Sequence, residues 1–268
     1  MFTHSIRQSA WLGLGLGLMV GTGGATAANL ISHYEFEGNT DNSVVGAPNG
    51  TLAGDAMLTS DAAVGAGALM LDGAGDYLDT TTAGLPQGSG LYEGTIDFWF
   101  KADPGISLGN RQFFGNLNAS DTTAILFGTN GAGGLQIFIR SADNSVFQIR
   151  NAIDGNAFNI DTTYADGEYH NIQFNWEVDA AGGSGSILVD GVALETQTVL
   201  NSLTTANPIT PWEFAQPIGA RNNRGSLDNF WAGKIDDVKI YDGIVPEPAS
   251  LAILALGGVV AGTRRRRV

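Results

Sequence analysis

Two adjacent carboxylates, Asp236 and Asp237, are the residues whose type and spacing suggest chemistry most directly. Carboxylates this close repel one another unless a cation, hydrogen-bond donors or solvent absorb the charge. Ca²⁺ takes about six to eight oxygen ligands from carboxylate, amide and carbonyl groups. If the first and last strands of the domain pair, Asn39 and Asp41 in the loop after the first strand lie near Asp236. Asn39, Asp41 and Asp236 therefore predict a structural Ca²⁺ site; the alternative is a set of solvated turn residues in an acidic protein.

A second set of side chains suits ligand binding. Trp212, Arg221 and Asn222 bring an aromatic ring, a guanidinium and an amide to neighbouring loops. Sugars stack their apolar faces on aromatic rings, and Arg and Asn hydrogen-bond to hydroxyl groups. The three residues predict a shallow contact site for a glycan or a protein. The alternative is that Trp212 fills the core.

The sequence offers little for catalysis. Retaining glycosidases need two carboxylates ~5 Å apart, and the nearest pattern, Glu177-Val178-Asp179, is followed by Ala and Gly where a further Glu is needed. Gly105-Ile106-Ser107-Leu108-Gly109 has the spacing of a Gly-x-Ser-x-Gly motif, but no helix pattern follows it, so it does not match a strand-to-helix nucleophile elbow. The chain has no cysteine and only three histidines, so thiol chemistry and a histidine-rich zinc cluster are excluded. We therefore expect no catalytic residue.

Charge narrows the choice of partner. The 268 residues include 13 Lys and Arg against 27 Asp and Glu, which gives a formal net charge of −14. Nucleic acid is a poor partner for such a chain because phosphate contacts need a basic surface. Divalent cations and neutral ligands such as sugars fit better. With no cysteine to form disulfides, the hydrophobic core alone must stabilise the fold.

Residues 1–28 predict a secretory signal peptide. Arg7 provides a basic start, an apolar run follows from Ala10 to Val20, and Ala25-Thr26-Ala27 has the small residues of a cleavage site. The apolar run is shorter than the ~20 residues that span a bilayer. We therefore expect the Sec machinery to export the protein and the mature domain to begin near residue 29.

Residues 29–243 predict one all-β domain. Short apolar runs alternate with Gly, Asn, Asp and Pro, and no long amphipathic helix pattern occurs. Ile96, Phe98 and Phe100 alternate with more polar positions, as in a strand with one buried face. Asp190-Gly191 supplies the positive φ angles of a type I′ hairpin turn. The pattern indicates a two-sheet antiparallel β-sandwich or jelly roll. The predicted strands are 31–36, 68–71, 95–101, 124–127, 135–139, 146–150, 171–176, 186–189 and 234–241.

Five segments, in order along the chain, resemble strand signatures of laminin G-like, concanavalin A-like domains. The departures are Met70, which stands where the family usually has an aromatic residue, and the long segment 201–224, which has no clear counterpart. The resemblance implies two curved antiparallel sheets, chain ends that lie close together and, frequently, one bound Ca²⁺ ion. The five segments are 68–78, 95–101, 168–172, 186–191 and 230–242.

The last residues, 244–268, are similar to the PEP-CTERM sorting tail of exported Gram-negative proteins, which an exosortase processes. The motif is Pro246-Glu247-Pro248, and the two prolines resist regular structure and keep it accessible. An apolar run over 251–262 and the arginines 264–267 complete the tail. We expect the apolar run to form a short transmembrane helix in the inner membrane, with the arginines on the cytoplasmic side. Because the run is short for a stable span, it suits a transient anchor.

The combined expectation is an exported, non-catalytic carbohydrate-binding or adhesion protein, released by exosortase to the cell surface or the exopolysaccharide matrix. One alternative is a glycan-active hydrolase, because the same sandwich superfamily contains such enzymes. Another is a structural matrix protein that binds no specific ligand.

Overall fold

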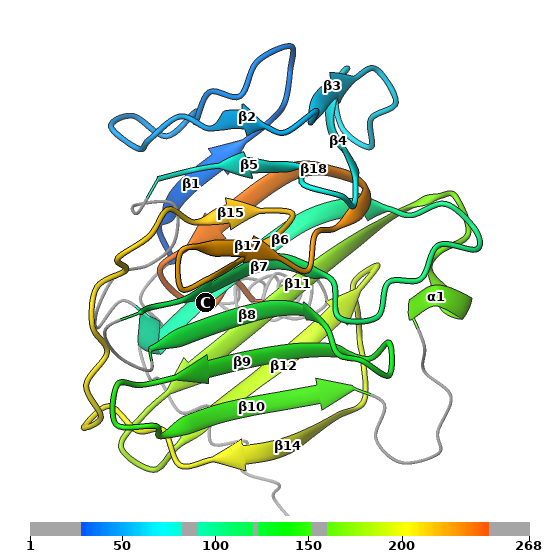
Figure 1. Cartoon of the computed structure of the whole chain (residues 1–268). Coiled ribbons are helices and arrows are strands. Elements are labelled where there is room, and N and C mark those ends of the chain that lie inside the picture. Colours follow the sequence, from blue (N-terminus) through cyan, green and yellow to red (C-terminus); the bar gives the residue numbers. More distant parts are fainter. Residues whose placement is uncertain (1–27, 82–90, 120–122, 152–159, 247–268) are drawn as a thin grey trace, which may run out of the picture.

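The computed structural model describes residues 28–81, 91–119, 123–151 and 160–246. Over this part of the chain two β-sheets pack face to face, and the one helix, α1 (Ile160–Thr163), has four residues (Figure 1). The predicted all-β sandwich is therefore confirmed. The predicted signal peptide and sorting helix lie outside the described residues. Within the described ranges, no helix is long and apolar enough to span a membrane.

The first sheet has eight strands in the order β13-β12-β11-β6-β18-β4-β3, and β1 pairs with β18. All of its pairings are antiparallel. Its strands are β1 (Leu30–Tyr34), β3 (Met57–Thr59), β4 (Ala68–Asp72), β6 (Glu93–Lys101), β11 (Tyr169–Val178), β12 (Gly183–Val189), β13 (Val192–Ala193) and β18 (Ala232–Tyr241).

The second sheet has ten strands in the order β14-β10-β9-β8-β7-β15-β5-β2, and β16 pairs with both β7 and β17. The β16–β7 pairing is parallel, whereas the other pairings of this sheet are antiparallel. In Figure 1 its strands β7 to β10 and β14 lie in front of β11 and β12. Its strands are β2 (Thr51–Ala53), β5 (Tyr77–Asp79), β7 (Gln112–Leu117), β8 (Ala124–Thr129), β9 (Leu135–Arg140), β10 (Val146–Asn151), β14 (Thr196–Asn201), β15 (Pro217–Ile218), β16 (Arg221–Asn223) and β17 (Ser226–Asp228).

The core lies between the sheets and is rich in aromatic residues. Ile96, Phe98 and Phe100 are all fully buried on the inner face of β6, which confirms the period of two. The ring of Trp231 lies 4.0 Å from that of Phe113, centroid to centroid, and it meets Phe100 edge-on at 5.8 Å. Such contacts between large rings supply much of the burial that a disulfide-free sandwich needs.

The segment between β14 and β15 closes one end of the sandwich. Leu203 is fully buried and Trp212 is 6% exposed, and both belong to the hydrophobic core. Asn118 Nδ2 donates to Pro211 O at 2.9 Å, and Asn116 Nδ2 donates to Phe214 O at 3.1 Å. These side-chain bonds replace the ladder bonds that an irregular segment lacks. Most of the segment 201–224, for which we expected no clear family counterpart, thus covers one end of the core.

The first and last strands pair, as predicted. Tyr34 of β1 lies opposite Val238 of β18, and Leu30 lies opposite Tyr241. Just beyond the strands, Asn29 N donates to Asp242 Oδ1 at 2.7 Å. The two ends of the sandwich domain therefore lie side by side, which confirms a further implication of the resemblance.

Candidate functional site

The carboxylate pair lies on a β-bulge in β18. Over Ala232–Ile235 this strand pairs with β4, and from Val238 onward it pairs with β1. Between these partners the register with β6 shifts, and Asp237 takes a positive φ of 50°. A bulge adds an unpaired residue and redirects side chains. The change of partner is the physical reason that both carboxylates, Asp236 and Asp237, turn into buried positions.

Asp236 anchors a loop through one of its two oxygen atoms. Its Oδ2 accepts hydrogen bonds from the amides of Ala63 and Val64 at 2.8 and 2.9 Å. Its Oδ1 is buried and has no hydrogen-bond partner among the described residues. Burial raises the pKa of Asp236 above its ordinary value, although the amide hydrogen bonds oppose this shift. An oxygen so placed can receive a cation or a proton.

Asn39 and Asp41, the other predicted metal ligands, lie in the exposed loop after β1. Asn39 Oδ1 accepts from the Asp41 amide at 2.9 Å, and Asp41 Oδ1 accepts from Asn49 Nδ2 at 2.7 Å. These bonds hold the two side chains within their own loop. The residue that reaches from this region toward the loop of Asp236 is Glu37, which accepts from the amide of Ala66. The three-residue Ca²⁺ site stays a prediction.

Asp237 belongs to a chain of polar contacts that the sequence did not reveal. Its Oδ1 lies 2.8 Å from His33 Nε2, its Oδ2 accepts from Lys239 Nζ, and His33 Nδ1 lies 3.0 Å from Ser43 Oγ. Ser, His and Asp are also the elements of a hydrolase triad. Here, however, the Ser43 amide donates to His33 O, so it is not available to bind an oxyanion. The contacts tie the first strand and its loop to the last strand.

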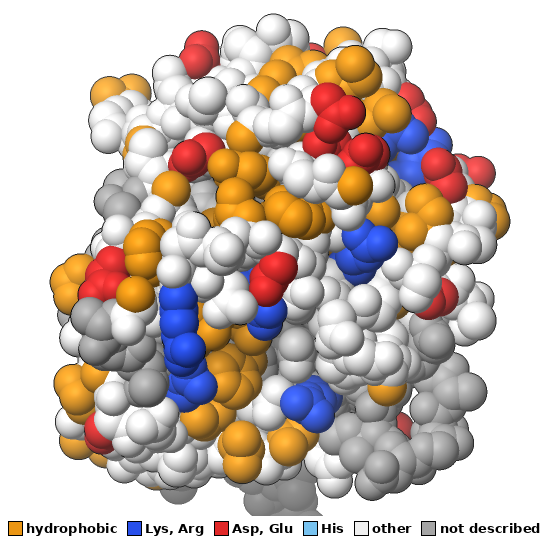
Figure 2. Space-filling view, viewed as in Figure 1, with side chains coloured by type: hydrophobic (Ala, Val, Ile, Leu, Met, Phe, Trp, Pro, Cys, Tyr) orange, Lys and Arg blue, Asp and Glu red, His pale blue; other side chains and the backbone are white. Residues whose placement is uncertain are grey.

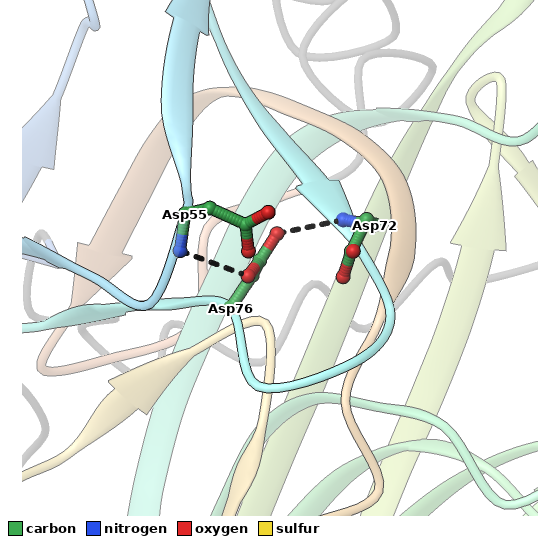
Figure 3. Close-up of side chains that lie close together, drawn as sticks. All are labelled: Asp55, Asp72 and Asp76. Carbon is green, nitrogen blue, oxygen red and sulfur yellow. Dashed lines mark hydrogen bonds between the residues drawn. The ribbon is translucent and has the colours of Figure 1, made fainter.

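A cluster of three carboxylates lies at the turns joining β2 to β3 and β4 to β5 (Figure 3). Asp55, Asp72 and Asp76 each have an oxygen within 4.8 Å of the others. Asp76 is buried and accepts from the amides of Asp55 and Asp72 at 3.2 and 2.9 Å, and Asp72 accepts from Ala74 N at 2.7 Å. Backbone amides thus donate hydrogen bonds to the buried carboxylate of Asp76, and these bonds hold the two turns together. Asp55 could not be connected to the other two from sequence spacing.

The carboxylates closest to a glycosidase pattern, Glu177 and Asp179, lie at the end of β11. Glu177 is exposed near the end of β11, and it contributes with Asp179 to the lining of a cavity of about 250 Å³. Asp179 Oδ1 accepts from Ala181 N and Gly182 N at 2.6 and 3.0 Å. Asp179 therefore caps the turn between β11 and β12, a structural use of its charge.

The predicted ligand-binding residues take three different positions. Trp212 lies in the core, which leaves little of its ring for a sugar to stack on. Asn222 is 8% exposed, and its side chain bonds to Ala215 O and to the amide of Gly225. Arg221 is partly exposed and forms two bonds with Asp228 at 2.6 and 2.7 Å. Of the three, Arg221 alone offers polar atoms to a ligand without rearrangement.

Arg221 lies on the outer face of the ten-stranded sheet. A Cβ atom placed on Gly115 would come within 3.0 Å of Arg221 Cβ, so the arginine stem crosses the strand at this glycine. Across the sheet, Gly115 is opposite Leu126, and Leu126 is opposite Phe138. Both apolar residues are partly exposed. Figure 2 shows hydrophobic side chains in a hollow of this face, with Lys or Arg side chains around them.

The outer face of the eight-stranded sheet holds the residues that precede the sorting motif. Thr95 Oγ1 accepts from Val245 N at 2.9 Å, and Gln173 Nε2 donates to Val245 O at 3.0 Å. Asn175 Oδ1 lies 2.8 Å from Thr95 Oγ1 and accepts from Gln173 Nε2 at 3.0 Å. The three polar side chains are almost fully buried here because the chain crosses them. A cavity of about 470 Å³ continues beside this segment to the exposed Pro246, the last described residue.

Solved structures share this fold at low sequence identity. Domain 4 of AbnA, a GH43 extracellular arabinanase from Geobacillus stearothermophilus, aligns with a TM-score of 0.53 and 16% identity, covering 82% of this chain and 95% of that one. The binding domain of botulinum neurotoxin serotype G aligns with a TM-score of 0.55 and 11% identity, covering 81% of this chain and 49% of the other. At such identities the likeness shows the fold. No curated protein matches the sequence.

Two family profiles match the sequence. One is the PEP-CTERM protein-sorting motif over residues 245–267, which marks the protein for export and surface association. The other is the concanavalin A-like lectin/glucanases superfamily over residues 72–248, more than half of the chain. Together with the two-sheet fold, this match shows that the chain belongs to the concanavalin A-like lectin/glucanases superfamily.

Proposed function

We propose that the protein is a non-catalytic carbohydrate-binding protein of the cell surface or exopolysaccharide matrix, and that it binds sugars on the outer face of the ten-stranded sheet. The observation that carries this proposal is the mixture of side chains there. Phe138 and Leu126 offer apolar surface, and the partly exposed Arg221 offers hydrogen-bonding groups on the same face, while Gln136 and Gln148 there are buried. Such a mixture suits a sugar, which has apolar and hydroxyl faces. That AbnA domain 4 was solved in complex with arabinotriose supports a sugar ligand for this fold.

A glycan array tests this proposal. The full chain, purified in mild detergent, is expected to bind at least one class of polysaccharide, and Phe138→Ala is expected to weaken that binding. Met70→Ala is the matched control, because Met70 is 40% exposed on the eight-stranded sheet. Binding that Phe138→Ala leaves unchanged would place the ligand elsewhere. A chain that folds and binds no glycan would refute the proposal.

A structural Ca²⁺ site at Asp236, with Asn39 and Asp41, is part of the proposal. The support is the buried, unpartnered Oδ1 of Asp236, since a cation would satisfy this oxygen. A cation that binds only the folded state stabilises it by RT ln(1 + [L]/Kd), about 2.7 kcal/mol at one hundred times Kd. Ca²⁺ is therefore expected to raise the melting temperature, and EDTA to reverse the rise. An unchanged melting temperature would show that no site is filled.

Export completes the proposal. In a Gram-negative cell, the Sec machinery exports the protein across the inner membrane, and the tail anchors it there transiently. An exosortase then processes it at Pro246-Glu247-Pro248. The bonds from Thr95 and Gln173 to Val245 support a defined starting point for the motif at the domain surface. Replacing the three motif residues by alanine should leave an unprocessed, membrane-held precursor, detected by fractionation and mass. Normal release of the variant would contradict this role.

A further inference from the structure

The chain between the last strand and the sorting motif is fixed to the domain. Gly243 is buried, and its carbonyl oxygen lies 3.0 Å from Thr95 Oγ1. Thr95 Oγ1 also accepts from Val245 N at 2.9 Å, and Gln173 Nε2 donates to Val245 O at 3.0 Å. The sheet therefore satisfies both backbone polar groups of Val245. The family profile of the sorting motif begins at this same residue.

No linker separates the fixed segment from the motif. Val245 is held by the sheet, and Pro246 is already the first residue of Pro246-Glu247-Pro248. Five residues lead from Pro246 to Leu251, where the apolar run begins, and a chain of this length spans at most ~18 Å. With the run anchored as proposed, the domain surface at Pro246 lies within that distance of the membrane. An enzyme that binds the motif while Val245 stays fixed therefore contacts this surface.

The surface beside the motif is a groove. A cavity of about 470 Å³ lies between residues 244–246 and the outer side of β11 and β12, where Glu177 and Ser184 line it. A second cavity of about 250 Å³ is lined by the same two residues and continues to Asp179 and Asn201. Glu177 and Ser184 are opposite one another in the sheet, and both are exposed. The two cavities thus form one groove, the tail groove, which begins at the motif and crosses the end of the sheet.

The tail groove is negatively charged. Glu177 and Asp179 line it, and no Lys or Arg does so among the described residues. Glu93 of β6 lies directly opposite Glu177, and both carboxylates are exposed. Like charges in this position destabilise a sheet, and a basic surface laid over them would relieve the repulsion. The charge of the groove therefore fits a basic partner.

We infer that the tail groove is a docking surface for the exosortase, which covers it with a basic surface while it holds the neighbouring motif. The inference rests on the proposed processing and adds that the folded domain is part of what the enzyme recognises. Because the residues before the motif are already ordered, binding them costs less entropy than binding a free tail. Pulling Val245 away would instead leave polar atoms of Thr95 and Gln173, each 5% exposed or less, without partners.

The rate of processing in cells that contain the exosortase tests the inference. Pulse–chase labelling follows the full-length precursor as its mass falls. Glu177→Lys reverses one charge of the tail groove and is expected to slow processing on the order of ten-fold. Glu177→Gln, which removes the charge and the repulsion with Glu93, should slow it roughly three-fold and carries the test if the lysine variant does not fold. Circular dichroism of the purified variants checks folding.

Glu168→Lys is the matched control for charge. Glu168 is also exposed and precedes the same strand, β11, at its other end. Nine residues separate it from Glu177, which is about 30 Å along a strand. The control should be processed at the wild-type rate. Equal slowing by Glu168→Lys and Glu177→Lys would show an effect of net charge and overturn the inference.

Loosening the attachment separates docking from release of the segment. Thr95→Val removes the acceptor of Val245 N, so the motif loses its fixed position beside the groove. We expect slower processing of this variant, and Thr95→Ser, which keeps the hydroxyl, should restore the rate. Processing of Thr95→Val at or above the wild-type rate would show that the segment leaves the sheet before the enzyme acts, and would overturn the inference.

Photo-crosslinking identifies what occupies the groove. Ser184→p-benzoylphenylalanine in the full chain is expected to form a light-dependent adduct with an epitope-tagged exosortase, and Glu168→p-benzoylphenylalanine is not. An adduct of two copies of this chain, or a crosslink from position 184 to the chain's own tail, would show a different occupant and overturn the inference.

The alanine variant of Pro246-Glu247-Pro248 keeps the two levels of the proposal apart. If that variant is processed normally, the proposed sorting role itself fails. If it is blocked while Glu177→Lys and Glu177→Gln are processed at the wild-type rate, the sorting role stands and the docking surface is refuted.

Discussion

Replacing Asp236 by Ala or by Asn separates its hydrogen bonds from its charge. Asp236→Ala removes the acceptor for the amides of Ala63 and Val64, at 2.8 and 2.9 Å. Hydrogen bonds to a charged group contribute about 1.5–3 kcal/mol each, so the gross loss is roughly 3–6 kcal/mol. Relief of the buried charge offsets part of this loss. We therefore expect Asp236→Ala to lower the free energy of unfolding by about 3 kcal/mol.

Asp236→Asn removes the buried charge and keeps the hydrogen bonds. An amide oxygen can still accept from both backbone amides, while the charge is gone. Burial raises the pKa of Asp236, so the folded state favours the neutral carboxyl. A raised folded-state pKa gives stability that is present below the unfolded pKa and is lost as the pH rises through the folded pKa. The Asn variant should therefore match or exceed the wild type at pH 7, and its advantage should shrink toward pH 4.

The assay is thermal and urea unfolding of both variants and the wild type in EDTA, at both pH values. A difference of about 3 kcal/mol corresponds to a separation of roughly 6–12 °C between the Ala and Asn variants for a domain of this size. If the Asn variant is as unstable as the Ala variant at pH 7, the negative charge itself stabilises the fold and the reasoning is wrong. Ca²⁺ added in excess of the EDTA should then raise the melting temperature of the wild type more than that of the Asn variant, whose amide oxygen carries no charge.

Two further perturbations probe the core and the attachment of the tail. Trp231→Ala, which empties the space against Phe113 at the centre of the sandwich, should cost about 3–5 kcal/mol in urea unfolding; a cost below 1 kcal/mol would show that the ring is not a core element. Thr95→Val removes the acceptor of Val245 N and should speed hydrogen exchange of that amide while leaving β7 and β8 unchanged. Equal protection of Val245 in the wild type and this variant would contradict the attachment.

The strands of the fold were predictable where apolar residues are dense. All nine predicted segments form strands, since alternation as in β6 creates a buried face that only a sheet can satisfy. The turn at Asp190-Gly191 was predictable too, and its φ angles of 51° and 73° fit the expected type. The six-residue strands β7 and β14 were missed. Strands such as β2, β15 and β16 were also missed, because two or three residues carry no period. For β15 the pairing partners β5 and β7 lie far along the chain.

The candidate sites were less predictable, because side-chain direction depends on pairing. The carboxylates of Asp236 and Asp237 could be recognised as a pair that needs compensation, yet their direction follows from the bulge where β18 changes partner. Trp212 could be read as a binding residue or a core residue, and the closing segment between β14 and β15 puts it in the core. Thr95 and Gln173 gave no local signal. Their common face exists only once β6 and β11 are in register.

The sequence by itself determined the sorting motif and the fold class, because these depend on patterns within single segments: the Pro-Glu-Pro tail, the alternation of apolar residues and the turn residues. Only the tertiary structure decided which carboxylates are shielded by amides and which polar side chains share a surface. The reason is physical. Burial and charge balance are sums over neighbours from distant strands, and a shift of one residue in pairing would turn each side chain to the opposite face.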